Sequence, residues 1–595
     1  MSIRTRTGLE ILQAALLIGI LGNVLLRQTP WGLNAFLFVT LFTAAMIVLA
    51  VRRRPELLTV RTLALQGAMV FFGAMFVIRD SIELRVYDTF AILIIMGVLV
   101  LPNFGVNARV AGAFHYVVGF LWSGISSAFA PFVLLGSDIE WKSMPGNRLS
   151  QNIFSVLRGL AIALPLILVF GALFMAADAA YEGMVNRAIN FELDTVISHI
   201  MLTSLFAWLT AGYFRGTIIE PFRAAVPVEP MVSPIPKETI ETPNDSAKNT
   251  EASFVDKFAA EVGETSNSLP DNATILEHIN RSDPPNTAEP ATIVAEPKKR
   301  DWQNFDNLKL PSVFTLGTVE TVIILGLVDL LFLSFVIVQV PYLFGGMELV
   351  QNTPDFKLAE YARRGFGELV AVAALVLPML LVSHWLLRRE TKRLEGLFRI
   401  LAGVQIALLF VIMASAVQRL ILLTGELGYG MTTVRFYPMV FMTWLAIVFV
   451  WFGITVLRGS RKHFAWGALW SAIVILGATN LMNPDAFIAS TNIMLTQQGR
   501  EFDASYNAGL SDDAIPTLIE ALPTMPREDQ CEVKSTIHYR YRELGQLTDL
   551  RSLNLSRRMA FKLLRENDSI LHETSSCHER FFNDRDPATY GHDPE

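Results

Sequence analysis

Long apolar stretches alternate with short polar ones along most of this chain. A stretch of about 20 predominantly apolar residues is long enough to cross a bilayer as an α-helix. The first stretch has no small-residue cleavage site after it, so we expect it to remain as the first span. The pattern predicts an all-α polytopic transmembrane protein with about eleven spans, near residues 9–26, 31–51, 62–78, 89–104, 157–177, 196–214, 313–340, 366–387, 400–423, 437–457 and 464–481.

Lys and Arg gather in connections that follow alternate spans. Cytoplasmic loops of membrane proteins carry an excess of these residues. The clusters predict a multi-pass protein of the cell membrane, with a cytoplasmic N-terminus and an extracytoplasmic region after residue 481. They consist of Arg52, Arg53, Arg54 and Arg61; Arg388, Arg389, Lys392, Arg393 and Arg399; and Arg458, Arg461 and Lys462.

The apolar segment 112–136 fits this topology only if it enters and leaves on the same side. A full crossing would place Arg215 and the long insertion after it outside, whereas counting back from the second half places them inside. Gly119, Gly124 and Pro131 could break such a segment, and broken helices are tolerated where protein covers them. We therefore expect a re-entrant or in-plane segment, with a plain span as the alternative.

Two regions differ from the apolar background and suggest four parts. Residues 222–300 are acidic and rich in Pro, Ser and Thr without periodicity, which predicts a disordered cytoplasmic linker. This linker would separate an N-terminal bundle, 1–221, from a C-terminal bundle, 301–481. Residues 482–595 predict a small extracytoplasmic helical region with a disordered tail. Its expected helices begin at an N-cap Ser511 and continue near 527–545 and 552–572.

Both cysteines of the chain, Cys531 and Cys577, lie in this last region. Disulfides persist in extracytoplasmic compartments, so a Cys531–Cys577 bond is one interpretation and two free thiols are the other. The neighbouring His572 and His578 complete no standard zinc spacing, and we predict no metal site.

Composition agrees with the hydropathy pattern. Of the 595 residues, 52% are hydrophobic and 17% are charged, whereas soluble domains carry about 25% charged residues. A net charge of −6 gives no reason to expect nucleic-acid binding. The expected partners are therefore the lipid bilayer and proteins that the sequence does not identify.

Several motifs together resemble one bacterial family. In the second half they are FVIVQVPYLFGG (335–346), EYARRGFGEL (360–369), YGMTTVRFY (429–437) and NLMNPDAFIASTN (480–492). In the first half they are IRDSIELRVYDTFAIL (78–93) and LRGLAIALPLILVFGALFMAADAAYEG (157–183). The chain resembles the membrane proteins of the domain of unknown function 4173 family, related to family 4153. That resemblance implies the architecture and supplies no catalytic residue.

Charged residues in the second half fall near the predicted external membrane face. Glu360, Arg364 and Glu368 share one helix stripe at i, i+4 and i+8, which permits ion pairing. The group forms either a pocket in which Arg364, Arg419 and Arg435 bind an anion or an ion-pair network that locks helix ends. The other members of the group are Glu426 and Asp485.

Asp329 lies near the middle of the span 313–340. Ionisable residues at membrane depth are costly and are often paired or functional. Asp329 is therefore a candidate proton or cation site. The alternatives are a neutral protonated acid and a partner for a polar residue on another span.

The sequence contains no enzyme motif on which a reaction could be built. We find no G-x-S-x-G, H-E-x-x-H, P-loop or dinucleotide fingerprint, and we predict no cofactor. The first functional hypothesis is therefore a non-enzymatic membrane protein of regulatory, sensing or scaffold type. The second is a secondary transporter or channel that uses Asp329 and the external Arg and Glu residues. A membrane enzyme acting on lipid or envelope substrates is the third, with the external Glu and Arg residues as its only support.

Overall fold

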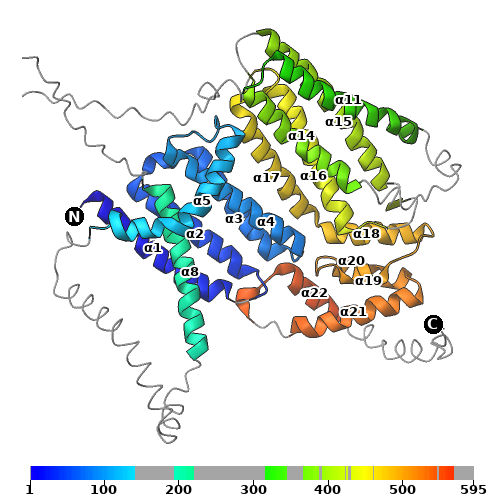
Figure 1. Ribbon diagram of the computed structural model, residues 1–595. Helices are drawn as coiled ribbons and strands as arrows, with labels where there is room; N and C mark the ends of the chain where they lie inside the picture. The colour runs from blue at the N-terminus through cyan, green and yellow to red at the C-terminus, as the bar shows by residue number, and fades with distance from the viewer. Residues whose placement is uncertain are drawn as a thin grey trace, which may run out of the picture. The chain divides into compact units, whose positions relative to one another are not determined.

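A computed structural model describes the chain as a set of packed helices, which confirms the all-α prediction (Figure 1). Contacts group Met1–Pro221 with Asp301–Glu595 in one compact unit, and Phe222–Arg300 in another. All residues that the structure describes belong to the first unit. The structure describes residues 2–27, 29–140, 193–219, 315–344, 366–387, 392–421, 424–425, 430–459, 461–545 and 549–567.

Among the described residues, five long helices build the first bundle. They are α1 (Ile3–Leu26), α2 (Leu33–Arg53), α3 (Val60–Ile78), α4 (Ile82–Val100) and α8 (Leu193–Ile218). We call the side on which α1 begins the N-terminal face, and the opposite side the cap face. On the N-terminal face Arg53 at the end of α2 pairs with Glu10 of α1. Asn103, after α4, donates to the carbonyls of Gly216 and Ile219 at the end of α8.

The second bundle holds α11 (Thr318–Phe344), α14 (Phe366–Leu386), α15 (Lys392–Ile421), α16 (Thr433–Thr455) and α17 (Phe464–Met482). Its apolar core is separate from that of the first bundle. The helix α17 links the two bundles, because its Ile473 belongs to the first core. Within α17, Asn480 donates to Asp88 of α4 over 2.9 Å, and both side chains are buried.

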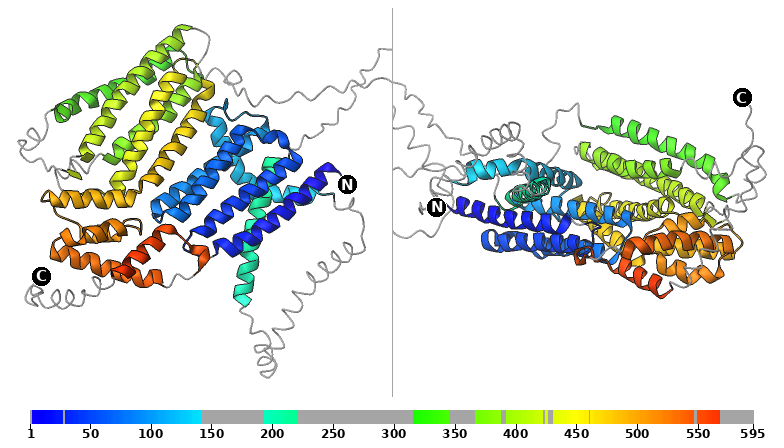
Figure 2. Two further views of the ribbon diagram at one scale, coloured as in Figure 1. Left: turned by 180° about the vertical axis from the view of Figure 1, so that it is seen from behind. Right: turned by 90° about the horizontal axis from the view of Figure 1, so that it is seen from below.

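After α17 the chain forms a small helical layer, Pro484–Glu566, that we call the cap. It contains α18 (Pro484–Gln497), α19 (Ala504–Gly509), α20 (Ile515–Ala521), α21 (Arg527–Gly545) and α22 (Leu555–Glu566), which lie together in Figure 2. Asn483 turns the chain from α17 into α18 with a left-handed backbone, φ 62°, which Asn tolerates better than most residues. The cap has its own core, which includes Leu84 of α4 and Phe436 of α16.

The predicted helices of the cap are confirmed near 527–545 and, with shorter bounds, near 552–572. Ser511 is not an N-cap, because α20 begins only at Ile515. The Ser511 hydroxyl donates to Asp485 of α18, and the local N–H that it accepts from, that of Asp513 at 3.4 Å, lies before the helix. The expected disordered tail lies outside the described residues.

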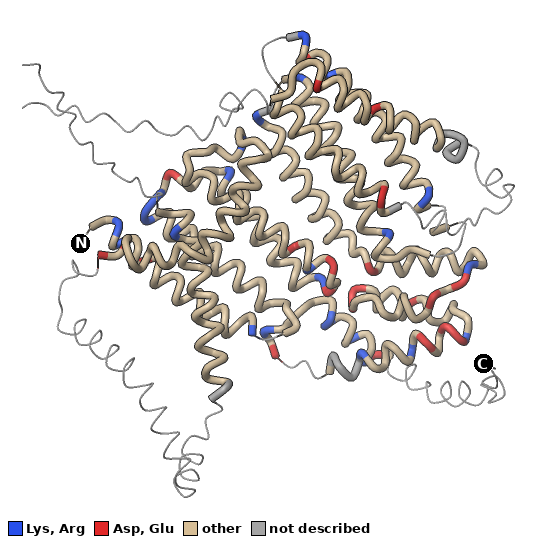
Figure 3. The backbone as a smooth tube through the Cα atoms, in the orientation of Figure 1, with Lys and Arg blue, Asp and Glu red and all other residues tan. Residues whose placement is uncertain are grey.

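Eleven helices among the described residues are long and apolar enough to cross a membrane. Ten correspond to predicted spans, and the eleventh, Ala113–Asp138, covers the segment expected to re-enter. The predicted span 157–177 lies outside the described residues. Figure 3 shows the middle parts of the spanning helices almost without charge.

The segment 112–136 forms a continuous helix, α5 (Ala113–Val133), and a π-helical turn follows it from Leu134 to Asp138. The expected break at Gly119 does not occur. Gly119 instead allows α5 to approach α4 closely, since a Cβ there would lie 2.6 Å from the Gly97 carbonyl oxygen. Gly212 of α8 meets α5 in the same way, and small residues commonly permit such contacts between membrane helices.

Both ends of α5 nevertheless lie at the N-terminal face, as an in-plane segment requires. Near its start, Tyr116 donates to the carbonyl of Ala108 in the preceding loop, over 2.9 Å. At its far end, Asp138 pairs with Arg4 at 2.6 Å and with Arg215 at 2.5 Å. In Figure 1 α5 runs across α1 and α4 rather than along them. By length and composition the helix could also cross a membrane, so re-entry stays a prediction.

Candidate functional site

The connection between α3 and α4 carries the charged residues Arg79 and Asp80, and it is where the cap meets both bundles. Arg79 donates to the carbonyls of Asn480 and Leu481 at the end of α17, over 2.6 and 2.9 Å. Asn554 of the cap donates to the carbonyls of Phe76 and Arg79 at the end of α3. Carbonyls that a helix end leaves unpaired therefore find partners on another segment.

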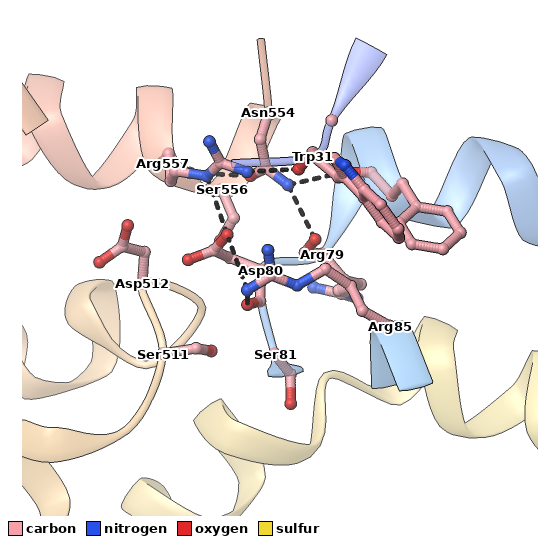
Figure 4. A network of polar contacts seen from close by, with 12 residues as sticks. Trp31, Arg79, Asp80, Ser81, Arg85, Ser511, Asp512, Asn554, Ser556 and Arg557 are labelled. Atoms are coloured by element: carbon pink, nitrogen blue, oxygen red, sulfur yellow. Dashed lines mark hydrogen bonds and ion pairs between the residues drawn. The ribbon is translucent and has the colours of Figure 1, made fainter. Parts of the chain in front are cut away.

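Arg557 of α22 is the central cation of this contact (Figure 4). Its Nε donates to Oδ1 of Asp80 over 2.8 Å, and its side chain is only 7% exposed. The other nitrogens donate to two carbonyls, that of Ser552 over 3.1 Å and that of Trp31 over 2.6 Å. One buried guanidinium thus joins the connections before α2, α4 and α22.

Asp513 is the matching anion from the cap. Its Oδ2 accepts from the backbone N–H groups of Asp80 at 2.7 Å and Ser81 at 3.1 Å, just before α4 begins. Its Oδ1 accepts from Ser556 at 2.6 Å, and Arg79 lies 3.7 Å away. A carboxylate favours a helix N-terminus, where N–H groups lack intrahelical partners. Asp513 of the cap therefore adds a carboxylate to the start of α4, where Asp80 and Glu83 are already present.

A cavity of about 750 Å³ lies beside these contacts, with walls from the cap and from both bundles. Its lining includes four carboxylates and three guanidiniums, and it also has hydroxyl and apolar groups. The charged residues are Asp80, Glu83, Asp485, Asp512, Arg85, Arg540 and Arg557; the others include Pro30, Ile82, Thr433, Tyr506, Leu510 and Ser511.

The three guanidiniums in the wall are bound to the protein. Besides Arg557, Arg85 donates to the Asp80 carbonyl over 2.8 Å and lies 3.7 Å from its carboxylate. Arg540 donates to the Leu510 carbonyl over 2.5 Å and lies 3.6 Å from Asp512.

Two other carboxylates in the wall, Glu83 and Asp485, have no ion pair among the described residues. Glu83 accepts from the Ser81 hydroxyl at 3.0 Å. Asp485 accepts from the Ser511 N–H at 3.2 Å and from its hydroxyl, both at Oδ2. Oδ1 of Asp485 is buried and makes no hydrogen bond within the described part of the chain.

Burial changes the acidity of this wall. Desolvation raises the pKa of Asp512 to about 7; the nearby Asp80 raises it further and Arg540 opposes the change. Desolvation likewise raises the pKa of Asp485 to about 6, against the hydrogen bonds from Ser511. Desolvation also raises the pKa of Asp80, against the attraction of Arg557 and Arg85. Buried carboxylates that repel one another bind protons more readily than exposed ones.

Of the charged group expected from the sequence, Asp485 is the member that lines the cavity. Glu368 lies in the first turn of α14 and Arg419 is buried in the last turn of α15. Arg435 donates to the Gly430 carbonyl at the start of α16. Three further members lie outside the described residues: Glu360, Arg364 and Glu426. Whether the group acts as a unit stays a prediction.

Asp329 and the cysteines are the remaining expected sites. Asp329 is buried in α11, and neither carboxylate oxygen has a hydrogen-bond partner among the described residues. The side-chain amide of Gln405 in α15 is likewise buried without a hydrogen-bond partner among the described residues, and α11 packs against α15. Cys531 is disulfide-bonded, whereas Cys577 lies outside the described residues. Pairing between the two cysteines therefore stays a prediction. No cluster of metal-binding side chains occurs within the described ranges.

Sequence reasoning missed the other residues that line the cavity. The motif IRDSIELR, which supports the family resemblance, holds Asp80, Glu83 and Arg85. Asp512 stood inside the expected helix start. Both the motif IRDSIELR and the segment around Asp512 could be recognised from their local sequence, but nothing in either one indicated that the two would meet in space.

The comparisons with known proteins place the chain in a family without assigning an activity. No curated protein and no solved structure matches it significantly. The model of one family, described as Domain of unknown function (DUF4153), matches residues 66–240 and 290–521. The match covers the first bundle from within α3 onward, the second bundle and the first helices of the cap, and it confirms the resemblance at the level of this related family. The chain belongs to the DUF4153 family of domains of unknown function.

Proposed function

We propose that this protein is a non-enzymatic membrane protein of the sensing or regulatory class, and that its cap is the sensing element. The cavity shared by cap and bundles carries this proposal. Its wall contains Asp80 and Thr433 from the bundles, and Asp485 and Asp512 from the cap. A ligand that contacts both sides binds the docked cap better than the undocked one, and it shifts the population accordingly.

The distribution of charge supports an orientation with the cap outside the cytoplasm. The connections at the N-terminal face contain Arg54, Arg61 and Arg109, and an excess of Lys and Arg marks cytoplasmic loops. On the cap face Arg79 and Arg85 lie beside Asp513 and Asp80. The disulfide at Cys531 also suits an oxidising compartment.

Sided labelling tests this orientation. Single cysteines would replace Arg109 or Gln498, both exposed, in a chain whose two native cysteines are replaced by Ser. An impermeant maleimide added to intact cells should label the variant at 498 and spare the one at 109 until the membrane is opened. The reverse pattern would place the cap in the cytoplasm and contradict the proposal.

A covalent block of the cavity tests the sensing function itself. A bulky maleimide on Thr433→Cys would occupy the cavity, and the same label on Gln498→Cys serves as the matched control. Hydrogen exchange of the full chain in lipid nanodiscs should change in α16 and α17 for the first label alone. Changes of hydrogen exchange that are confined to the residues at the rim of the cavity would refute the coupling of cap and bundles.

Secondary transport is the second candidate, and the buried oxygens of Asp329, which have no hydrogen-bond partner in the described part of the chain, favour it. Intramembrane acids often mark proton or cation pathways. Proton-coupled flux in proteoliposomes should then be lost in Asp329→Asn, with Glu320→Gln in the first turn of α11 as control. Flux that survives Asp329→Asn, or no flux at all, would leave a buried acid with a structural role.

A further inference from the structure

We propose that the cavity between cap and bundles binds a small organic cation that carries a primary ammonium group, with the carboxylate of Asp485 as its anchor. This assignment rests on the proposed sensing function and adds the chemical class of the ligand. The charge balance of the wall, the burial of Asp485 and the apolar groups nearby support it.

The charge balance of the wall favours a cation. Arg557 and Arg85 both lie beside Asp80, and Arg540 lies beside Asp512, so each guanidinium already has a carboxylate partner within the protein. Glu83 and Asp485 have no cation beside them among the described residues. An anionic ligand would have to displace an existing ion pair, whereas a cationic one would meet two carboxylates for which the described structure supplies no counter-ion.

Asp485 is the group that such a cation would contact. Its residue is only 2% exposed, and it lines the cavity at the start of α18. Ser511 occupies Oδ2 and leaves the buried Oδ1 as an acceptor without a donor in the described structure. Buried polar atoms generally have hydrogen-bond partners, and a charge-assisted N–H donor is among the strongest available.

The wall suits an organic ammonium better than a metal ion. Calcium takes six to eight oxygen ligands, and no cluster of three metal-binding side chains occurs among the described residues. Ile82, Leu510 and Pro30 provide apolar surface for a carbon chain. Tyr506 adds an aromatic ring, and aromatic rings attract cations.

Calorimetric titration of the full chain in nanodiscs tests the proposal, with 1,4-diaminobutane as the probe. The neutral diol 1,4-butanediol has the same length, and tetramethylammonium has the charge without N–H donors. The diamine should bind, and the two comparison compounds should bind at least tenfold more weakly or not at all. Heat from calcium chloride but none from the diamine would overturn the ligand class.

Variants identify the anchor. Asp485→Asn should weaken diamine binding by roughly tenfold to a hundredfold, the range for a lost hydrogen bond to a charged group. Glu83→Gln is the second variant, in case Asp485→Asn does not fold, and should also weaken binding. Glu520→Gln removes an exposed carboxylate of the cap and should leave binding unchanged. Unchanged binding in both cavity variants would refute the assignment.

The ligand assignment and the sensing function can fail separately. Diamine binding without any change of hydrogen exchange in α16 and α17 would support the ammonium site and contradict the sensing function. If α16 and α17 respond to the maleimide on Thr433→Cys but the folded chain binds no diamine, the sensing function is supported and the ammonium site is contradicted.

Discussion

Replacing Arg557 by Met should release the cap from the bundles. The substitution keeps an unbranched apolar side chain and removes the guanidinium that donates to Asp80, Ser552 and Trp31. Removing one partner of a buried ion pair costs about 3–5 kcal/mol, because the other charge is left buried. Arg85 stays 3.7 Å from the Asp80 carboxylate, which favours the lower end of that range.

A cost of about 3 kcal/mol raises the population of the undocked cap roughly a hundredfold. Chymotrypsin cleavage of the full chain in nanodiscs measures that population when the cap opens and closes faster than it is cleaved. Arg558 lies next in α22 and is exposed, so Arg558→Met is the matched control. Its effect should stay within about 0.5 kcal/mol, as for most surface substitutions.

Adding Asp80→Asn to Arg557→Met removes the charge left behind. The double variant should therefore be less destabilised than the sum of the two single variants, since residues in one network are not additive. Equal cleavage of Arg557→Met and Arg558→Met would refute the role given to this ion pair.

Three further predictions concern the acidic wall and the helix contacts. The cap should dock more tightly as pH falls from about 7 toward about 4, because Asp512 and Asp485 have pKa values of about 7 and about 6 when docked, above the unfolded value. Gly212→Ala should lower the free energy of unfolding in detergent by about 1–3 kcal/mol, because its Cβ would lie 2.4 Å from two carbonyl oxygens of α5. Asp138→Ala should expose the N-terminal face to hydrogen exchange, at a cost of about 3–5 kcal/mol, because it leaves two guanidiniums without their carboxylate.

Each of these predictions has a control. For the pH effect, docking favours the protonated carboxyl groups. As pH rises through their docked pKa values they lose these protons, so docking weakens as pH rises. Asp512→Asn should flatten the profile, and a profile that rises with pH would contradict the assignment. For the helix contacts, a Cβ at Gly124 of α5 meets nothing within 4 Å, so Gly124→Ala should be tolerated. For Asp138, exchange that stays unchanged in Asp138→Ala would show that its ion pairs do not hold the face together.

Helices that depend on local pattern could be predicted from the sequence. The bounds 527–545 of α21 follow from a polar helical stretch that ends at Gly545. The segment 112–136 was harder, because its glycines suggested a break although they serve close contacts with α4 and α8. A glycine's role as a breaker or as a contact depends on what lies opposite, and the local sequence does not contain that information.

The cavity could not be predicted, because its walls come from segments hundreds of residues apart. Asp80 and Arg557 are separated by 477 positions, and no periodicity relates them. Asp485 was identified as a charge at a helix end, but its partner Ser511 was expected to cap its own helix. Tertiary contacts gave both side chains roles that differ from those suggested by their local sequence.

Hydrogen exchange of the unmodified chain in nanodiscs tests most directly whether cap and bundles form one unit. Three segments meet at the Asp80–Arg557 pair: residues 78–85, 509–513 and 554–558. Amides protected by one cooperative unit open together. The three segments should therefore exchange slowly and at a common rate. Exchange of 509–513 and 554–558 within seconds, while 78–85 stays protected, would show that the cap is not docked on the bundles.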